Sequence, residues 1–166
     1  MRRIVLTGPE CSGKTTLSKG LAEHFQGKYL AEPARTILNG VRAYTPKDLL
    51  AIFRAYIKRD DVELSSNPLF LDTDLQNLYL WWQEKYGPVP RKLCRAYKAQ
   101  SERFFLLCKP DLPWVYDPLR ENPNDRERLY ELYYRDLVDR KLPFTVIEGD
   151  GVERLEKSIE IVSANV

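Results

Sequence analysis

The stretch GPECSGKT, residues 8–15, decides the fold of this chain. It follows the apolar run Ile4-Val5-Leu6 and precedes residues 16–25, in which leucines and a phenylalanine recur at helical spacing. The pattern G-x-x-x-x-G-K-S/T between a strand and a helix is the Walker A motif, in which loop N–H groups and the helix N-terminus bind phosphate. The sequence therefore predicts a P-loop and a polyphosphate ligand.

The residues of this loop have predicted tasks in binding ATP and Mg²⁺. Gly8 and Gly13 let the backbone fold so that its N–H groups point at phosphate oxygens. Lys14 is expected to reach the β- and γ-phosphates of ATP, and Thr15 to give its hydroxyl to Mg²⁺. The residues predicted to bind the nucleotide are Gly8, Pro9, Glu10, Cys11, Ser12, Gly13, Lys14, Thr15 and Thr16.

Strand and helix patterns alternate along the rest of the chain. Short apolar runs, typical of strands buried on both faces, cover residues 3–7, 28–32, 69–72, 103–108 and 144–148. Helical patterns cover residues 16–25, 73–85, 91–99, 125–140 and 151–162, and another begins at Pro46. This alternation predicts an α/β fold with a five-stranded parallel sheet flanked by helices.

Composition limits the number of domains and the kinds of partner. The chain has 166 residues, 43% of them apolar and 30% charged, which indicates one globular domain over residues 1–166. Basic residues number 26 and acidic residues 24, without a basic block, so nucleic acid is not an expected partner. No apolar stretch approaches the roughly 18 residues that span a bilayer.

Cysteine usage indicates the compartment. Cys11, Cys94 and Cys108 form no close pair and no metal-ligand spacing, which predicts a protein of the reducing cytoplasm. The expected partner is a small-molecule substrate. The sequence is compatible with a homo-oligomer as well as with a monomer.

Acidic residues follow the third predicted strand. Asp72 ends the run Phe70-Leu71-Asp72, at the sheet edge where ligands of α/β proteins bind, and is expected to hold Mg²⁺ through water. Asp74 has two interpretations. Its carboxylate can contact an acceptor hydroxyl, or it can cap the helix that follows.

Glu32 ends the second predicted strand and precedes Arg35 by three residues. A carboxylate at this edge can accept the proton of an attacking hydroxyl, which predicts an alcohol as phosphoryl acceptor. The alternative is a helix-capping glutamate that pairs with Arg35 at the surface.

A polar, proline-rich segment, residues 111–126, lies between the fourth strand and the next helix. Its arginines, Arg120 and Arg126, are suited to contact the migrating phosphoryl group and to exclude water, which predicts a lid. The alternative is a solvated loop whose charges pair with one another.

These features resemble the ribosylnicotinamide kinase domain of the bacterial NadR proteins and related P-loop kinases. The family pattern has a P-loop, a Glu followed by Arg, a strand ending in Asp-Thr-Asp, and Pro-Trp-Val followed by Asp and Arg. In this chain the matching residues are 8–15, Glu32 with Arg35, 70–74, and Pro113-Trp114-Val115 with Asp117 and Arg120. The order and approximate spacing match over nearly the whole chain.

The resemblance implies transfer of the ATP γ-phosphate to the 5′-hydroxyl of nicotinamide riboside, a reaction of NAD biosynthesis. It implies that Lys14 and Thr15 contact ATP and Mg²⁺, that Asp72 or Glu32 lies near the acceptor hydroxyl, and that Arg120 and Arg126 belong to the lid. Glu32-Pro33 is also similar to the Glu-Pro of deoxynucleoside kinases, whose Glu is the base at a 5′-hydroxyl.

One departure concerns the aromatic residues that flank the Glu. NadR-type domains have a Trp-Glu-Tyr triplet, whereas Ala31 and Pro33 flank Glu32 here. Another aromatic face can replace the stacking partner, although aromatic residues at helical spacing also fit a core. The candidates are Tyr29, Tyr56, Tyr79, Trp81 and Trp82. The residues predicted to bind substrate are Glu32, Arg35, Tyr56, Asp74 and Trp114.

Two other functions remain open on the sequence alone. The chain can be an ATP-binding regulatory or NTPase module, in which a partner protein senses the bound nucleotide. It can also be a kinase for another nucleoside, for a nucleotide or for a non-nucleoside alcohol. A nucleotide acceptor needs further cations for its own phosphate, for which Arg35, Arg42 and Lys47 are candidates.

Overall fold

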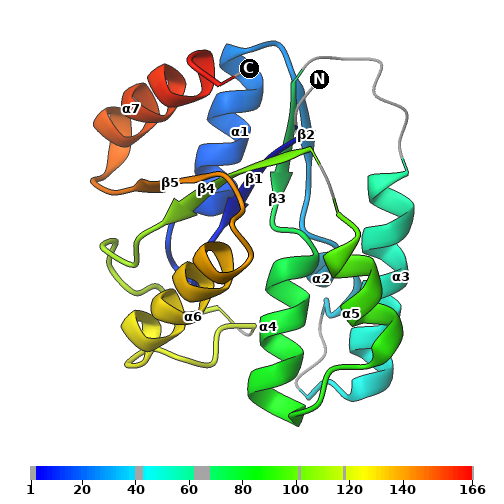
Figure 1. Ribbon diagram of the computed structural model, residues 1–166. Coiled ribbons are helices and arrows are strands. Elements are labelled where there is room, and N and C mark those ends of the chain that lie inside the picture. Colours follow the sequence, from blue (N-terminus) through cyan, green and yellow to red (C-terminus); the bar gives the residue numbers. More distant parts are fainter. Residues whose placement is uncertain (1–2, 40–42, 62–67, 101, 118, 166) are drawn as a thin grey trace.

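The computed structural model describes residues 3–39, 43–61, 68–100, 102–117 and 119–165, and shows a five-stranded parallel sheet with helices on both faces (Figure 1). The strands are β1 (Arg3–Thr7), β2 (Lys28–Leu30), β3 (Leu69–Asp72), β4 (Arg103–Cys108) and β5 (Phe144–Ile147), in the order β2-β3-β1-β4-β5. The predicted fold class is confirmed.

Seven helices are found in the described ranges. They are α1 (Lys14–His24), α2 (Pro33–Ile37), α3 (Pro46–Asp60), α4 (Leu75–Tyr86), α5 (Arg91–Lys98), α6 (Arg126–Asp139) and α7 (Gly151–Ser163). None of the described helices is long and apolar enough to cross a membrane.

The two faces of the sheet bury alternate residues of the same strands. Ile4 and Leu6 of β1 pack with α1 and α7 on one face, whereas Val5 packs with α4 and α6 on the other. Because both faces are covered, the strands are continuous apolar runs rather than alternating ones. Helices α2 to α5 share a separate cluster of buried residues, which includes Ile52 and Leu78, beside the sheet (Figure 1).

The strand order determines which loops meet. β1 lies between β3 and β4, and Leu6 is in register with both Asp72 and Leu106. The loop that follows β1 is therefore next to the carboxyl end of β3, and β2 on the far side of β3 brings Glu32 to the same edge.

Three predicted element ends shift by two residues, each for a local reason. α1 begins at Lys14 rather than residue 16, because Gly13 is its N-cap. α4 begins at Leu75, since Thr73 has a φ of 64° and Asp74 is the N-cap. β2 ends at Leu30 because Pro33 already opens α2, a short helix that the sequence indicates only through the spacing of Glu32 and Arg35.

Candidate active site

At its first glycine, the phosphate loop lies against the backbone at the end of β4. Gly8 has a φ of 125°, and a Cβ there would lie 2.5 Å from the carbonyl oxygen of Cys108. A side chain at this position would collide with backbone, so only glycine allows the chain to turn from β1 into the loop. The loop then leads directly into α1, whose N-terminal N–H groups face an anion-binding position.

The side chain of Lys14 folds back against the phosphate loop that precedes it. Its Nζ donates hydrogen bonds to the carbonyl oxygens of Gly8 (2.9 Å) and Pro9 (2.6 Å), and the hydroxyl of Ser12 also donates to Pro9 (2.7 Å). Lys14 lines the cavity described below. The ammonium group is therefore placed where loop N–H groups and helix dipole already favour phosphate.

Thr15 and Asp72 form the contact between the loop and β3. The Thr15 hydroxyl donates a 2.6 Å hydrogen bond to Oδ2 of Asp72, to which Tyr29 also donates at 3.3 Å. Burial and the negative charge of Asp72 raise the pKa of Tyr29 to about 12, so Tyr29 stays a neutral donor. Oδ1 of Asp72 is buried and has no hydrogen-bond partner among the described residues.

The Thr15 and Asp72 oxygens fit a magnesium ion. Mg²⁺ in nucleotide sites takes one or two protein oxygens and completes its shell with phosphate and water. A hydroxyl beside a carboxylate that has one unsatisfied oxygen supplies this donor set. A dense protein cage is not needed, and no group of three or more His, Cys, Asp or Glu side chains suited to a metal occurs within the described ranges.

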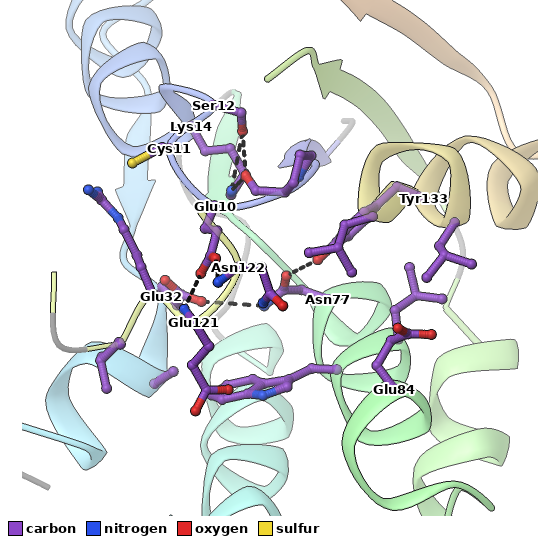
Figure 2. A pocket seen from close by; sticks show the side chains of 18 of the residues that line it. Glu10, Cys11, Ser12, Lys14, Glu32, Asn77, Glu84, Glu121, Asn122 and Tyr133 are labelled. Atoms are coloured by element: carbon purple, nitrogen blue, oxygen red, sulfur yellow. Dashed lines mark hydrogen bonds between the residues drawn. The ribbon is translucent and has the colours of Figure 1, made fainter. Parts of the chain in front are cut away.

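One cavity of about 480 Å³ contains both the phosphate loop and a wall of side chains from α2, α4, α6 and the 111–126 segment. Residues 9–16 line its loop end. Figure 2 shows Glu32, Asn77, Glu84, Glu121 and Tyr133 around the other end, with Glu10 between the two. The phosphate loop and a second group of polar side chains therefore face the same cavity.

Glu32 faces this cavity from the N-cap position of α2. Its side chain makes no cap hydrogen bond and is 16% exposed. Oε2 lies 3.6 Å from Nε of Arg35, and Oε1 accepts a 3.4 Å hydrogen bond from Asn77. Burial, followed by the negative charge of Asp72, raises the pKa of Glu32, which suits a carboxylate that must take up a proton.

Arg35 connects α2 to the 111–126 segment. Its guanidinium bonds to Asp117 at 2.9 Å as well as approaching Glu32, and it lines the cavity. The alternative of a purely superficial Glu32–Arg35 pair does not describe this geometry, because Glu32 is largely buried and points into the cavity.

The segment 111–126, described except for Pro118, packs over the phosphate loop. The Glu10 carboxylate accepts hydrogen bonds from the backbone N–H groups of Glu121 (3.1 Å) and Asn122. The sulfur of Cys11 lies 3.3 Å from the backbone nitrogen of Val115. This side of the loop is therefore covered by the predicted lid segment.

The two lid arginines differ in position. Arg120 lines the cavity and donates to the carbonyl oxygen of Val115 at 2.5 Å. Arg126 donates to the carbonyl oxygens of Leu112 (2.9 Å) and Cys11 (3.4 Å), and its guanidinium lies 5.9 Å from the Trp114 ring centroid. Neither Arg126 nor Trp114 is among the cavity-lining residues.

Two residues predicted to bind substrate have structural positions instead. Tyr56 is 1% exposed, lies in the cluster of α2 to α5, and its hydroxyl is 2.6 Å from that of Thr73. Asp74 is fully buried, caps α4 by accepting from Gln76 N at 2.9 Å, and pairs with Arg103 at 3.1 Å. Neither residue is among those that line the cavity, and Asp74 makes the helix cap that was the alternative for it.

Several cavity residues escaped sequence analysis. Asn77, Glu84 and Lys85 lie on α4 with Trp81, and Arg128 and Tyr133 lie on α6. Residues 77, 81, 84 and 85 recur at helical spacing directly after Asp72, and this polar side of α4 was the available signal. The α6 residues offered none, because only the packing of α6 against α4 brings them to the cavity.

Comparison with known proteins places the chain among P-loop folds. The model of the family described as "AAA domain" matches residues 3–154. No curated protein matches the sequence significantly. Among solved structures, NadR in complex with NR superposes with a TM-score of 0.75 at 16% identity, over 98% of this chain and 51% of that chain. The chain thus spans about half the length of that protein.

Two further solved structures match over nearly their whole length. YorR from Bacillus subtilis, in complex with phosphorylated GDP, has a TM-score of 0.59 at 16% identity, over 98% of this chain and 95% of that chain. Shikimate kinase from Bacteroides thetaiotaomicron has a TM-score of 0.54 at 14% identity, over 98% of this chain and 97% of that chain. At these identities the likeness establishes the fold.

Proposed function

We propose that this chain, which belongs to the AAA domain family, is an ATP-dependent kinase that phosphorylates the 5′-hydroxyl of a nucleoside, with nicotinamide riboside as the acceptor. The observation that carries the proposal is that Glu32 and the phosphate loop face one cavity. A module that only binds nucleotide needs no proton-accepting carboxylate beside the phosphate loop, whereas transfer to an alcohol is favoured by one.

The residues divide the reaction between them. The acceptor oxygen attacks the γ-phosphorus, its proton passes to Glu32, and the bond from the γ-phosphorus to the β–γ bridging oxygen breaks to leave ADP. Lys14 and Arg120 stabilise charge on the transferred group. Thr15 and Asp72 would hold Mg²⁺, which when bound neutralises charge on the β- and γ-oxygens. ATP as donor agrees with the solved complex of NadR with NAD and AMP-PNP.

Trp81 supports an acceptor with an aromatic ring. Of the five aromatic residues expected as stacking partners, Trp81 lines the cavity. Its Nε1 donates to the hydroxyl of Tyr44 at 2.6 Å, and the two rings meet edge to face at 4.8 Å, which fixes the plane of the indole. A pyridinium ring can stack on such a face and gains cation–π attraction there. The solved complex of NadR with NR is consistent with this acceptor.

The cavity charges argue against an acceptor that carries its own phosphate. Apart from Lys14 and Arg120, which are assigned to the transferred phosphoryl group, the cations on its wall are already paired: Arg35 with Asp117 (2.9 Å), Lys85 with Glu121 (2.9 Å) and Arg128 with Glu84 (2.6 Å). A phosphate would have to displace these carboxylates or lie beside them. Lys47 does not line the cavity, and Arg42 lies outside the described residues.

An assay of ATP conversion to ADP tests the proposal. Purified protein with Mg²⁺ is given nicotinamide riboside, common nucleosides, their monophosphates or shikimate, with a no-acceptor control. We expect ADP formation that depends on nicotinamide riboside. Turnover with another acceptor alone would replace the substrate and keep the mechanism, whereas acceptor-independent turnover or none would favour a regulatory NTPase.

A further inference from the structure

Two hydrogen bonds in series lead from α6 through α4 to Glu32 (Figure 2). The hydroxyl of Tyr133 donates to Oδ1 of Asn77, and Nδ2 of the same amide donates to Oε1 of Glu32 at 3.4 Å. Tyr133 and Asn77 are 56 positions apart, and Asn77 and Glu32 are 45 apart. The chain of contacts is therefore a product of tertiary packing and ends on the carboxylate that accepts the proton in the proposed reaction.

The direction of the two bonds follows from the chemistry of the groups. Tyr133 is 7% exposed, and burial raises the pKa of its phenol well above the usual range, so it remains a neutral hydroxyl. By donating to the amide oxygen of Asn77, it turns the amide nitrogen towards Glu32. The opposite orientation of the amide would place its oxygen against a carboxylate, which is unfavourable.

We propose that Asn77 and Tyr133 are positioning residues, which hold the Glu32 carboxylate in the orientation that accepts the proton of the acceptor hydroxyl. This inference rests on the proposed function only in assigning that task to Glu32. Arg35 approaches Oε2 from α2 at 3.6 Å, but it is 42% exposed and shared with Asp117. Asn77 supplies the second point of attachment, at Oε1, and Tyr133 acts on Glu32 only through Asn77.

Steady-state kinetics separates positioning from substrate contact. Tyr133→Phe removes one hydroxyl from the chain of contacts, and Tyr130→Phe removes one from the preceding turn of the same helix as a control. A general base contributes about 10²- to 10⁴-fold, and misorientation loses part of this. We expect Tyr133→Phe to lower kcat about tenfold with KM for ATP and nicotinamide riboside within about twofold, and Tyr130→Phe to match the parent.

Asn77→Leu, of similar volume, removes the donor itself and should lower kcat by about 10- to 100-fold. A rise in KM for nicotinamide riboside without loss of kcat, in either variant, would mean that the substituted residue contacts the substrate directly and would overturn the positioning role. Equal kcat for Tyr133→Phe and Tyr130→Phe would also overturn it.

A measurement without substrate tests the same contacts if nicotinamide riboside proves not to be the acceptor. The protein is labelled with ¹³C at the glutamate carboxyl, and the Glu32 signal is identified by its loss in Glu32→Gln. A donated hydrogen bond stabilises the charged carboxylate, so Tyr133→Phe and Asn77→Leu should move the titration midpoint of Glu32 to higher pH. Tyr130→Phe should leave it unchanged.

The charges that also act on Glu32 are kept in all three variants. They are Asp72, Lys14, Arg35 and Arg59, and the phenols of Tyr29 and Tyr56 also interact with Glu32. A midpoint equal to that of the parent in both Tyr133→Phe and Asn77→Leu would overturn the inference, whichever acceptor the enzyme uses. Failure of the acceptor assay with the midpoint shifted would reject the proposed substrate and retain the positioning role.

Discussion

The hydroxyl of Thr15 donates a 2.6 Å hydrogen bond to Oδ2 of Asp72, and this contact joins the end of the phosphate loop to the carboxyl end of β3. It is made possible by the parallel pairing of β1 with β3, which brings Leu6 level with Asp72. The second oxygen of Asp72 is buried without a partner among the described residues. A buried carboxylate oxygen left in this state is unfavourable unless a cation or water reaches it.

Asp72→Asn should weaken the response to magnesium. The amide keeps the size of the side chain but loses the charge that attracts the cation. We expect the Mg²⁺ concentration for half-maximal turnover to rise at least about tenfold, as for the loss of one charged metal contact. Initial rates over a range of Mg²⁺ concentrations measure this, with the exposed Asp139→Asn as the matched control. If the two variants had the same dependence of rate on Mg²⁺ concentration, Asp72 would have no role in binding the metal.

Lys14→Ala should abolish most of the turnover and leave the fold intact. Among the described residues, the hydrogen bonds of the Lys14 ammonium go to Gly8, Pro9 and Ser12 of the phosphate loop, so the substitution removes no hydrogen bond to the core. Removal of one preorganised charge from a transition state lowers kcat by about 10²- to 10³-fold. The exposed Lys19→Ala on the same helix is the control, and circular dichroism checks folding. Near-parental turnover of Lys14→Ala would refute the phosphate-site assignment.

The pH dependence of the reaction rate should reflect the protonation of Glu32. Its pKa lies above the 4.5 of a solvated glutamate because of burial and the charge of Asp72. A base works only when deprotonated, so kcat/KM, which reports the groups of the free enzyme, should fall as the pH drops through this raised pKa, and its acid limb should lie above pH 4.5.

Glu32→Gln should remove that limb together with most of the turnover, while the Kd for ATP, measured by calorimetry, stays within about twofold. Because burial of the charged carboxylate is unfavourable, the variant should be at least as stable as the parent at pH 7. Equal losses in ATP binding and in phosphoryl transfer would show that Glu32 has a structural role and is not the base.

The features that sequence predicted are those specified locally. The phosphate loop lies between Thr7 and Lys14, and its glycines, lysine and flanking strand and helix are contiguous in the chain. Asp72 and Glu32 were predicted by a rule that is almost as local, since each ends or follows a strand of a parallel sheet. These positions needed no knowledge of how helices pack.

The residues that the structure places elsewhere than expected are those whose surroundings depend on distant partners. Asp74 looks like a site residue by position, but Arg103, 29 residues later, pairs with it inside the protein. Tyr56 is an aromatic residue that the fold uses as core. Asn77 and Tyr133 were missed for the converse reason, because their contacts join helices α4 and α6, which the sequence cannot place side by side.

Trp81 should determine the affinity for the acceptor. Its indole lines the cavity and is held by Tyr44. Stacking of a base on an aromatic side chain contributes about 1–3 kcal/mol, so Trp81→Leu should raise KM for the acceptor at least about fivefold with KM for ATP unchanged. Trp81→Phe keeps an aromatic face and should restore most of the affinity. Equal KM values for the acceptor in the Leu and Phe variants would show that ring stacking on residue 81 does not contribute to substrate binding.

Gly8→Ala should destabilise the protein more than Gly87→Ala, although both glycines have positive φ, 125° and 78°. A Cβ on Gly87 meets nothing within 4 Å, so the cost there is that of an unfavourable backbone conformation alone, φ 78° with ψ −125°, or about 1–3 kcal/mol. A Cβ on Gly8 would lie 2.5 Å from the Cys108 carbonyl oxygen. Because the Cβ is fixed to the Cα and the oxygen belongs to the backbone, neither can turn away. The added strain should bring the loss for Gly8→Ala to about 3 kcal/mol or more. Urea unfolding of the two variants measures the difference in stability. Equal losses would show that β4 moves away from the loop at little cost. The close approach of loop and strand would then not be the reason for glycine at position 8.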